Sequence, residues 1–175
     1  VTKNGDNTVV SMKLKVSADR YLEYRYELQP NDYMMDFSIQ SKGLNTVLNS
    51  SQTVNLDWSL KAFRHDKSIT YENRYTRLTY QHEDDKVDKL SPTGEDEEDV
   101  EDLKWFSFRQ HFFSSYLVSE KPIKNVSLAS LDHVKDEEVD TLFTKTFAAK
   151  IPLELQAGEV NENLKLYFGL TDHLV

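Results

Sequence analysis

The stretch Val10-Ser11-Met12-Lys13-Leu14-Lys15-Val16 decides the fold class, because apolar and polar residues alternate along its whole length. An alternation of period two gives a β-strand one apolar face and one polar face. The same period continues from Leu22 to Leu28 and from Tyr33 to Ile39. The connections at 17–20 and 29–32 are short and rich in turn-forming residues. Short connections between half-buried strands predict an antiparallel meander.

The rest of the chain extends this pattern. Further strands are expected at Val54–Ala62, at 75–81, around Val126, at Leu142–Leu153 and at Leu164–Phe168. The Asn- and Ser-rich stretch 41–53 predicts a loop, and 65–73 could hold a short helical turn. Many strands and no long helix predict an all-β, antiparallel sandwich with few short helices.

Residues 82–102 differ from the rest of the chain in composition, because carboxylates dominate them. A block of like charges favours a solvated loop, so we expect an exposed acidic excursion within a single domain spanning 1–175. The run Glu95–Asp102 could attract a hard cation, but it lacks the D-x-[DN]-x-[DN]-G spacing of a calcium loop. We therefore expect no metal site here.

Composition excludes several classes of function. The 175 residues carry a formal net charge of -9, which argues against nucleic acid and against adsorption to an anionic lipid surface. The absence of cysteine excludes disulfides, thiol catalysis and iron–sulfur ligation. No apolar run reaches the ~18 residues that a membrane span requires. Because the sequence starts at Val1 without a methionine, we expect it to be an expressed or processed fragment, from which targeting segments have been removed.

Trp105, His111 and Phe112 are the candidate binding residues. They belong to an aromatic concentration between 105 and 113, in which His111 follows Gln110. Such a histidine could act as a general acid or base, but no carboxylate accompanies it in the same segment. The aromatic residues could stack on sugar rings, and they could equally form the sandwich core. With no nucleophile elbow and only five glycines for a phosphate loop, we expect no catalytic residue and no cofactor.

Three segments carry a resemblance to a known family. The first runs from Tyr21 to Leu28 and continues to Phe37. The second runs from Tyr71 through the acidic stretch to Trp105 and Gln110-His111-Phe112-Phe113. The third is Leu166-Tyr167-Phe168-Gly169. In this order and spacing they resemble the large periplasmic domain of the YidC family of bacterial membrane protein insertases, over essentially the whole chain.

The resemblance implies a β-supersandwich related to galactose mutarotases, on the periplasmic side of the bacterial inner membrane. It implies that the chain is the later part of a larger domain, whose earliest strands precede Val1. The insertase activity of the family lies in a transmembrane core, so no insertase residue transfers to this chain. Mutarotases use a histidine and a glutamate as their acid–base pair, and only His111 offers a loose match here.

Three functions therefore stay open. The domain could be an accessory scaffold or protein-interaction domain of an insertase, contacting Sec translocon components or loops of substrate proteins. It could be a carbohydrate-binding module that uses the aromatic residues around Trp105. It could be a mutarotase-like enzyme that uses His111, although the sequence does not reveal the carboxylate that would be its acid–base partner. Fold alone does not choose among them.

Overall fold

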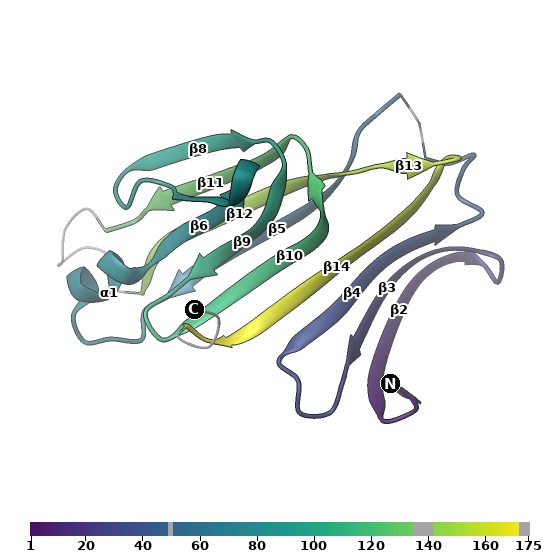
Figure 1. The fold of residues 1–175 in the computed structure, drawn as a ribbon, viewed down its shortest axis with the longest axis horizontal. Coiled ribbons are helices and arrows are strands. Elements are labelled where there is room, and N and C mark those ends of the chain that lie inside the picture. Colours follow the sequence, from purple (N-terminus) through teal and green to yellow (C-terminus); the bar gives the residue numbers. More distant parts are fainter. Residues whose placement is uncertain (49–50, 135–141, 172–175) are drawn as a thin grey trace.

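The computed structural model describes residues 1–48, 51–134 and 142–171, which form two antiparallel β-sheets and one short helix (Figure 1). The larger sheet has the strand order β1-β2-β3-β4-β14-β10-β9-β6-β7, and β13 pairs with β14. Its strands are β1 (Thr2–Asn4), β2 (Asn7–Ser17), β3 (Arg20–Leu28), β4 (Met34–Lys42), β6 (Arg77–His82), β7 (Lys86–Lys89), β9 (Leu103–Arg109), β10 (Phe113–Ile123), β13 (Leu155–Gln156) and β14 (Glu159–Leu170).

The smaller sheet has the order β5-β12-β11-β8. Its strands are β5 (Val54–Phe63), β8 (Glu95–Val100), β11 (Val126–Asp132) and β12 (Phe143–Leu153). The α1 helix (Ile69–Tyr75) joins β5 to β6, and a single 3-10 turn, η1 (Glu83–Asp85), joins β6 to β7. Every strand pair in the described residues is antiparallel, so the predicted all-β antiparallel sandwich is confirmed.

The hydrophobic core lies between the two sheets. Phe106 and Phe108 of β9 and Phe147 of β12 are fully buried, and the rings of Phe108 and Phe147 stack across the sheets with centroids 5.5 Å apart. Trp58 of β5 contacts Phe106 and Phe108, with ring centroids 5.6 and 4.9 Å away. The alternating residues of facing strands meet in this layer, as the period-two pattern requires.

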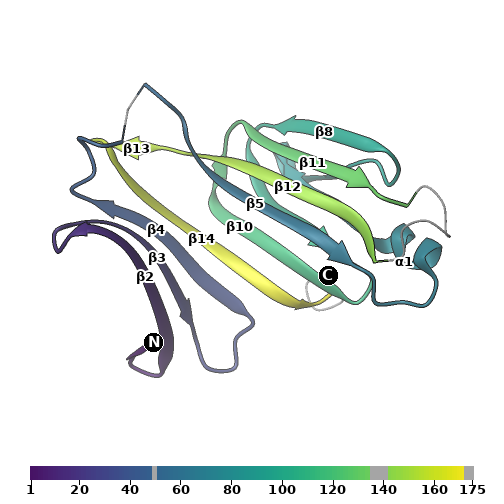
Figure 2. The same cartoon turned by 180° about the vertical axis from the view of Figure 1, so that it is seen from behind.

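The smaller sheet is narrower than the larger one. It lies over β6, β9, β10 and part of β14, whereas β2, β3 and β4 extend beyond its edge (Figure 2). The strand that forms this edge is β5, since β12 is its strand partner within the described residues. One part of the larger sheet is therefore covered, and the other continues without a second layer.

The prediction of an acidic loop over 82–102 is wrong for two segments. Residues 86–89 form β7 and residues 95–100 form β8, which pairs with β11 in the smaller sheet. The side chains of β8 are mostly exposed, and Val100 is its buried residue. An edge strand needs few apolar residues and gains from charge, which prevents pairing with other chains. The sequence therefore did not reveal β8, because its residues are mostly acidic and its stability comes from backbone pairing with β11.

Two other local predictions have mixed outcomes. The loop predicted over 41–53 is confirmed at residues 43–48 and 51–53, residues 49–50 lie outside the described residues, and Ser41 and Lys42 complete β4. The short helical turn around 65–73 is α1, shifted toward Tyr75. The strand β11 ends at Asp132, and residues 135–141 lie outside the described residues.

Candidate functional site

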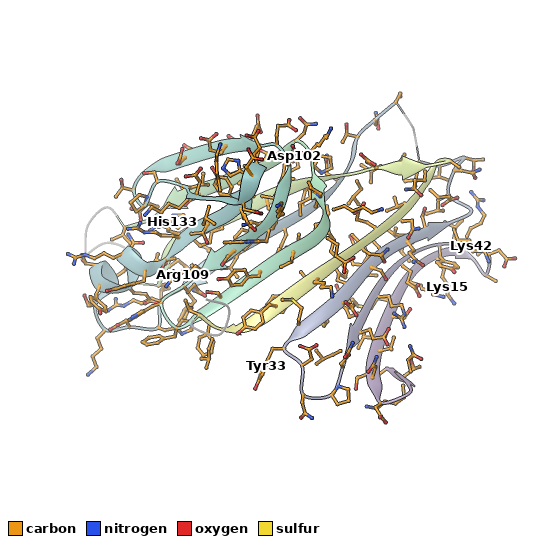
Figure 3. The ribbon with its side chains drawn as sticks, viewed as in Figure 1. Lys15, Tyr33, Lys42, Asp102, Arg109 and His133 are labelled. Atoms are coloured by element: carbon orange, nitrogen blue, oxygen red, sulfur yellow. The ribbon has the colours of Figure 1, made fainter. Side chains whose placement is uncertain are left out.

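Aromatic side chains gather at one end of the sandwich, and we call this surface the aromatic end. Its members come from the end of β5, from the loop and helix that follow it, from the β9–β10 turn and from the start of β12: Phe63, His65, Tyr71, Tyr75, His111, Phe112, Phe113 and Phe143. Arg109 and His133 lie near this end, whereas Lys15 and Lys42 lie at the far end of the long sheet (Figure 3).

The helix α1 is fixed at both sides by side-chain hydrogen bonds. The Ser68 hydroxyl caps its first turn by accepting from the Tyr71 N–H at 3.2 Å. The buried Glu72 carboxylate accepts from the backbone N–H groups of His65 and Asp66 at 2.8 and 2.9 Å. This carboxylate therefore shapes the loop before the helix and holds Asp66 in place.

A buried lysine attaches the same helix to the smaller sheet. Lys145 of β12 is fully buried, and its Nζ donates to the backbone and side-chain oxygens of Asn73. The Asn73 amide in turn donates to the Asp132 carboxylate of β11 at 3.1 Å. Desolvation lowers the pKa of the Lys145 ammonium to about 8, and the nearby Asp132 carboxylate opposes that shift. This chain of hydrogen bonds makes α1 a rigid support.

His111 lies at the centre of the aromatic end. Its ring stacks on Tyr75 at a centroid distance of 4.7 Å, meets the edge of Tyr71 at 5.3 Å and contacts the Phe112 ring at 4.2 Å. Its Nδ1 lies 3.6 Å from Asp66 Oδ2, which is too long for a hydrogen bond. The structure thus supplies a carboxylate beside His111 from another loop, which the sequence did not reveal.

The structure separates the three residues that the sequence singled out. His111 and the exposed Phe112 lie together at the aromatic end. Trp105 lies four residues before the end of β9, which is about 13 Å along an extended strand. Its ring contacts Tyr116, on the sheet face that points away from the core residues Phe106 and Phe108. Trp105 is therefore not part of the same site.

Sequence reasoning missed Asp66, Tyr71 and Tyr75. Tyr71 and Tyr75 are four positions apart, so on a helix their rings lie side by side, and their centroids are 5.1 Å apart. A confident helix prediction would have revealed this pair, and Ser68 as an N-cap was the available signal. Asp66 carried no local signal, because its partner His111 is distant in sequence.

The terminal Tyr-Phe-Gly segment has a packing role beside the aromatic end. The Tyr167 hydroxyl donates to the Leu170 carbonyl at 2.9 Å, which places its ring across Gly169. A Cβ at Gly169 would lie 2.5 Å from the Tyr167 hydroxyl oxygen. The chain then reaches Thr171, whose N–H donates to the Phe112 carbonyl at 3.0 Å. The segment therefore ties the end of β14 to the β9–β10 turn.

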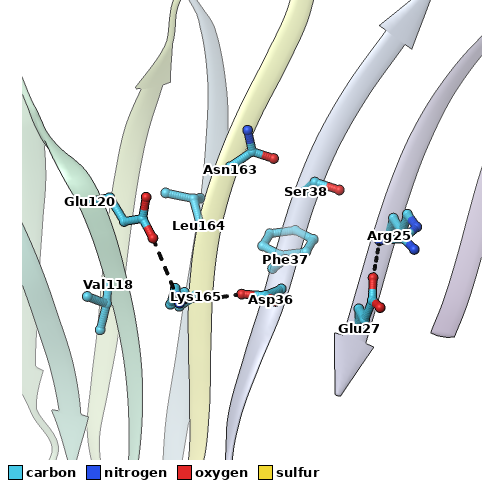
Figure 4. Close-up of a pocket in the computed structure, with 10 residues that line it drawn as sticks. All are labelled: Arg25, Glu27, Asp36, Phe37, Ser38, Val118, Glu120, Asn163, Leu164 and Lys165. Carbon is cyan, nitrogen blue, oxygen red and sulfur yellow. Dashed lines mark ion pairs between the residues drawn. The ribbon is translucent and has the colours of Figure 1, made fainter. Parts of the chain in front are cut away.

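A second candidate site is a hollow of about 310 Å³ on the outer face of the larger sheet, across β3, β4, β14 and β10 (Figure 4). Its two cations each have an acidic partner: Arg25 Nη1 lies 2.7 Å from Glu27 Oε2, and Lys165 Nζ lies 3.7 Å from Asp36 Oδ1 and 3.8 Å from Glu120 Oε1. Side-chain hydrogen bonds lower the pKa of Glu27, and the bond from Asn7 has the largest effect. With both cations already paired and one carboxylate in excess, the hollow offers a small ligand a net charge of only about one to recognise.

Within the described ranges, no group of three or more metal-ligating side chains is gathered in one place. Over those same residues, no helix has the length and apolar character needed to cross a bilayer.

Comparisons with known proteins agree on one family. The family described as the YidC periplasmic domain matches residues 1–172. A relative named membrane protein insertase YidC from Bacteroides fragilis is 32% identical over 169 residues, which are 95% of this chain and 27% of the relative. Relatives of the same name are 32% identical in Parabacteroides distasonis, over 95% of the chain, and 33% identical in Azobacteroides pseudotrichonymphae, over 93%. The chain spans about a quarter of the length of each.

Proposed function

The chain belongs to the YidC periplasmic domain family, on the periplasmic side of the inner membrane, and from that premise we propose that it is an accessory interaction domain that supports membrane protein insertion and folding. The proposed contact surface is the aromatic end. Its partners would be protein segments, either components of the Sec translocon or periplasmic loops of substrate proteins. Insertion itself would depend on parts of the whole protein outside these 175 residues.

The observation that carries this proposal is the exposure of rigidly held aromatic side chains. Phe63, Tyr71, Tyr75, Phe112 and Phe113 are each 40% to 51% exposed. Large aromatic side chains with few rotatable bonds are typical anchors of protein–protein contacts. Ser68, Glu72 and Lys145 hold α1 and the loop before it in place, and α1 carries Tyr71 and Tyr75. A partner would therefore meet a surface that needs little ordering on binding.

The surroundings of His111 favour packing over acid–base catalysis. Tyr75 and Phe112 contact the ring, and Asp66 lies beyond hydrogen-bonding distance of Nδ1. A catalytic histidine is normally oriented by a hydrogen bond to its second nitrogen. The His111 ring therefore acts, in this proposal, as part of the aromatic surface.

Co-purification from membranes tests the proposal. The full-length protein carrying Phe112→Ala and Phe113→Ala should lose most of its association with translocon proteins, because both side chains are exposed and their removal leaves the core intact. Val47→Ala, an exposed apolar residue in the loop after β4, is the matched control and should retain association. Association that is unchanged in the double variant would contradict the proposed contact surface.

A carbohydrate-binding module is the second candidate, because exposed aromatic rings can also stack on sugars. Calorimetric titration of the full-length protein with a panel of glycans separates the two. Saturable heat that disappears in the double variant would favour sugar binding, whereas a flat response favours the protein partner. The same sugars test the mutarotase-like enzyme: their anomerisation rates are measured with the wild-type protein and with His111→Ala. Unchanged rates in the variant would exclude catalysis by His111.

A further inference from the structure

Two arginines lie on the outer face of the larger sheet where it reaches the aromatic end. Arg77 begins β6, Arg109 ends β9, and the two residues are directly opposite each other in the strand pairing. Residues in this position have side chains on the same face, with Cβ atoms roughly 4.5–5.5 Å apart. The next pair, Leu78 and Phe108, is buried in the core, so the arginines are on the opposite face. Two positive charges therefore lie side by side on the outer face.

These arginines have no acidic partner. Across residues 1–48, 51–134 and 142–171, neither guanidinium forms an ion pair. The two carboxylates of the aromatic end have other neighbours, because Glu72 accepts from backbone N–H groups and Asp66 lies 3.6 Å from His111. The chain has 30 acidic and 21 basic residues, so the lack of a partner does not reflect a shortage of carboxylates. Like charges directly opposite each other are unfavourable, and an anion between them would remove that repulsion.

Arg109 also has a hydrogen-bond donor without an acceptor. Its Nε is buried and has no partner, although the residue as a whole is only half-buried. The hydroxyl of Ser107, on the same face of β9, is likewise buried and without a partner. Arg77 differs, because its Nε donates to the Arg74 carbonyl at 3.0 Å. Buried donors are normally satisfied, so the unpaired donors beside Arg109 favour an anionic ligand here.

The arginine pair and the aromatic end form one surface. Tyr75 lies two residues before Arg77, His111 lies two residues after Arg109, and the two rings stack at a centroid distance of 4.7 Å. A step of two residues is about 7 Å along an extended strand. A segment that contacts the rings of Tyr75 and Phe112 would therefore have the arginines within reach of its next few side chains.

We propose that Arg77 and Arg109 bind a carboxylate side chain of the protein segment that contacts the aromatic end. The inference rests on the proposed function and adds the chemistry of the partner, which is an acidic residue close to apolar or aromatic ones. A guanidinium presents its donors in a planar fork that matches a carboxylate. The net charge of -9 disfavours acidic segments over the rest of the surface, so the arginine pair would also determine where such a segment binds.

The surroundings favour a protein carboxylate over the phosphate groups of a lipid surface. The exposed rings beside the arginines suit the apolar side chains of a polypeptide. A lipid surface presents many anionic groups together, and it would repel a chain of net charge -9 as a whole. A single carboxylate on a flexible segment can reach the arginines without bringing further negative charge with it.

Carbodiimide crosslinking, in membranes that contain the full-length protein, tests the chemical class of the ligand. Arg109→Lys places an amine at the site, and carbodiimide joins an amine directly to a carboxylate in contact with it. We expect a product that links position 109 to an Asp or Glu of another protein, identified by mass spectrometry. Lys15, at the far end of the larger sheet, is the control amine and should not give this product (Figure 3).

A charge variant measures how much the arginine site contributes. Arg109→Gln should weaken association with translocon proteins by about tenfold, because the partner carboxylate loses a charged donor. Arg109 Nε has no hydrogen bond to lose, so this variant should accumulate in membranes to the wild-type level. Lys15→Gln removes the same charge far from the site and should retain association. Added NaCl should weaken the association of the wild type more than that of Arg109→Gln.

The outcomes separate this inference from the proposed function. Unchanged association in the Phe112→Ala and Phe113→Ala double variant contradicts the proposed function, whatever the arginine variants do. Loss in the double variant with full association in Arg109→Gln overturns the arginine site alone. Loss in Arg109→Gln without a carbodiimide product would indicate a phosphate ligand and would also overturn the proposal. A product that joins position 109 to a carboxylate of these 175 residues would overturn it too, because the partner would then be internal.

Discussion

β9 and β2 both place apolar side chains on the inner face of the larger sheet, in very different surroundings. In β9, Phe106 and Phe108 are fully buried beneath the smaller sheet. In β2, Met12 and Leu14 belong to the same inner face of the same sheet, yet more than half of each side chain is exposed. Alternation therefore reports which face of a strand is apolar. Whether that face is buried depends on what lies over it.

The largest expected difference is in side-chain truncation. Phe106→Ala should lower the free energy of unfolding by about 3–5 kcal/mol, because it leaves a cavity between the sheets. Leu14→Ala in the 175-residue chain should cost less than about 0.5 kcal/mol, because its side chain is mostly in water. Urea unfolding of both variants measures this contrast. Similar losses would mean that the two regions do not differ as described.

Removing the buried carboxylate of the covered region should have the next largest effect. Glu72→Ala should cost about 2–3 kcal/mol, since the N–H groups of His65 and Asp66 lose a charged acceptor. The exposed Glu120, removed in the same way, should have little effect. The proton NMR chemical shifts of the His111 ring in Glu72→Ala would show whether the aromatic end also changes. An unchanged His111 environment in a destabilised Glu72→Ala variant would show that the loop does not position Asp66.

The buried lysine should give a smaller loss with a distinctive pH dependence. Lys145→Met should cost about 1–2 kcal/mol at pH 7, because Asn73 loses its partner. The folded-state pKa of Lys145 is lowered from 10.5 to about 8, so the unfolded chain binds more protons between these values. The contribution of Lys145 to stability should therefore rise from pH 8 to pH 10. Urea midpoints of wild type, Lys145→Met and the exposed control Lys150→Met across this range provide the test. A constant difference between wild type and Lys145→Met would contradict it.

The smallest effect is expected at the border of the uncovered region. Hydrogen bonds lower the pKa of Glu159. The one from the Ser41 hydroxyl has the largest effect, and the N–H groups of Leu44 and Asn45 contribute less. Its stabilising contribution should be present above the unfolded pKa near 4.5 and be lost as pH falls through the lower folded value.

Burial raises the pKa of Glu162 on the same strand, so its contribution has the opposite sign and is lost as pH rises through the folded value. Glu159→Gln should flatten the acid side of the stability curve, whereas Glu162→Gln should raise stability near neutral pH. Thermal melts from pH 3 to 7 compare the two variants. Parallel curves for both would show that the local hydrogen bonds of Glu159 do not matter.

The sequence predicted the strands whose two faces differ in polarity, such as β2, β3 and β4. It failed at β8, because Glu95 to Asp99 offer no alternation and a paired edge strand does not require any. It placed α1 only approximately, since a helix of seven residues is too short for a clear period. Each failure occurred where backbone pairing or capping, rather than apolar burial, stabilises the segment.

The candidate site was predicted in part. His111 and Phe112 stood out by composition, and they do lie together at the aromatic end. Trp105 stood out for the same reason and lies on the other face of its strand from Phe106. Neighbours in sequence along a strand point to opposite faces, so an aromatic concentration does not define one surface.

The sequence by itself determined the antiparallel strands that alternate in polarity, the apolar face of each of these, and the family to which the chain is similar. These properties are local, or depend on residue order alone. Only the tertiary structure decided that Asp66 meets His111, that α1 carries Tyr71 and Tyr75 to the same place, and that the apolar face of β2 is left uncovered. Hydrophobic burial is non-directional, so an apolar face can be read from the sequence, whereas its cover depends on the path of the whole chain.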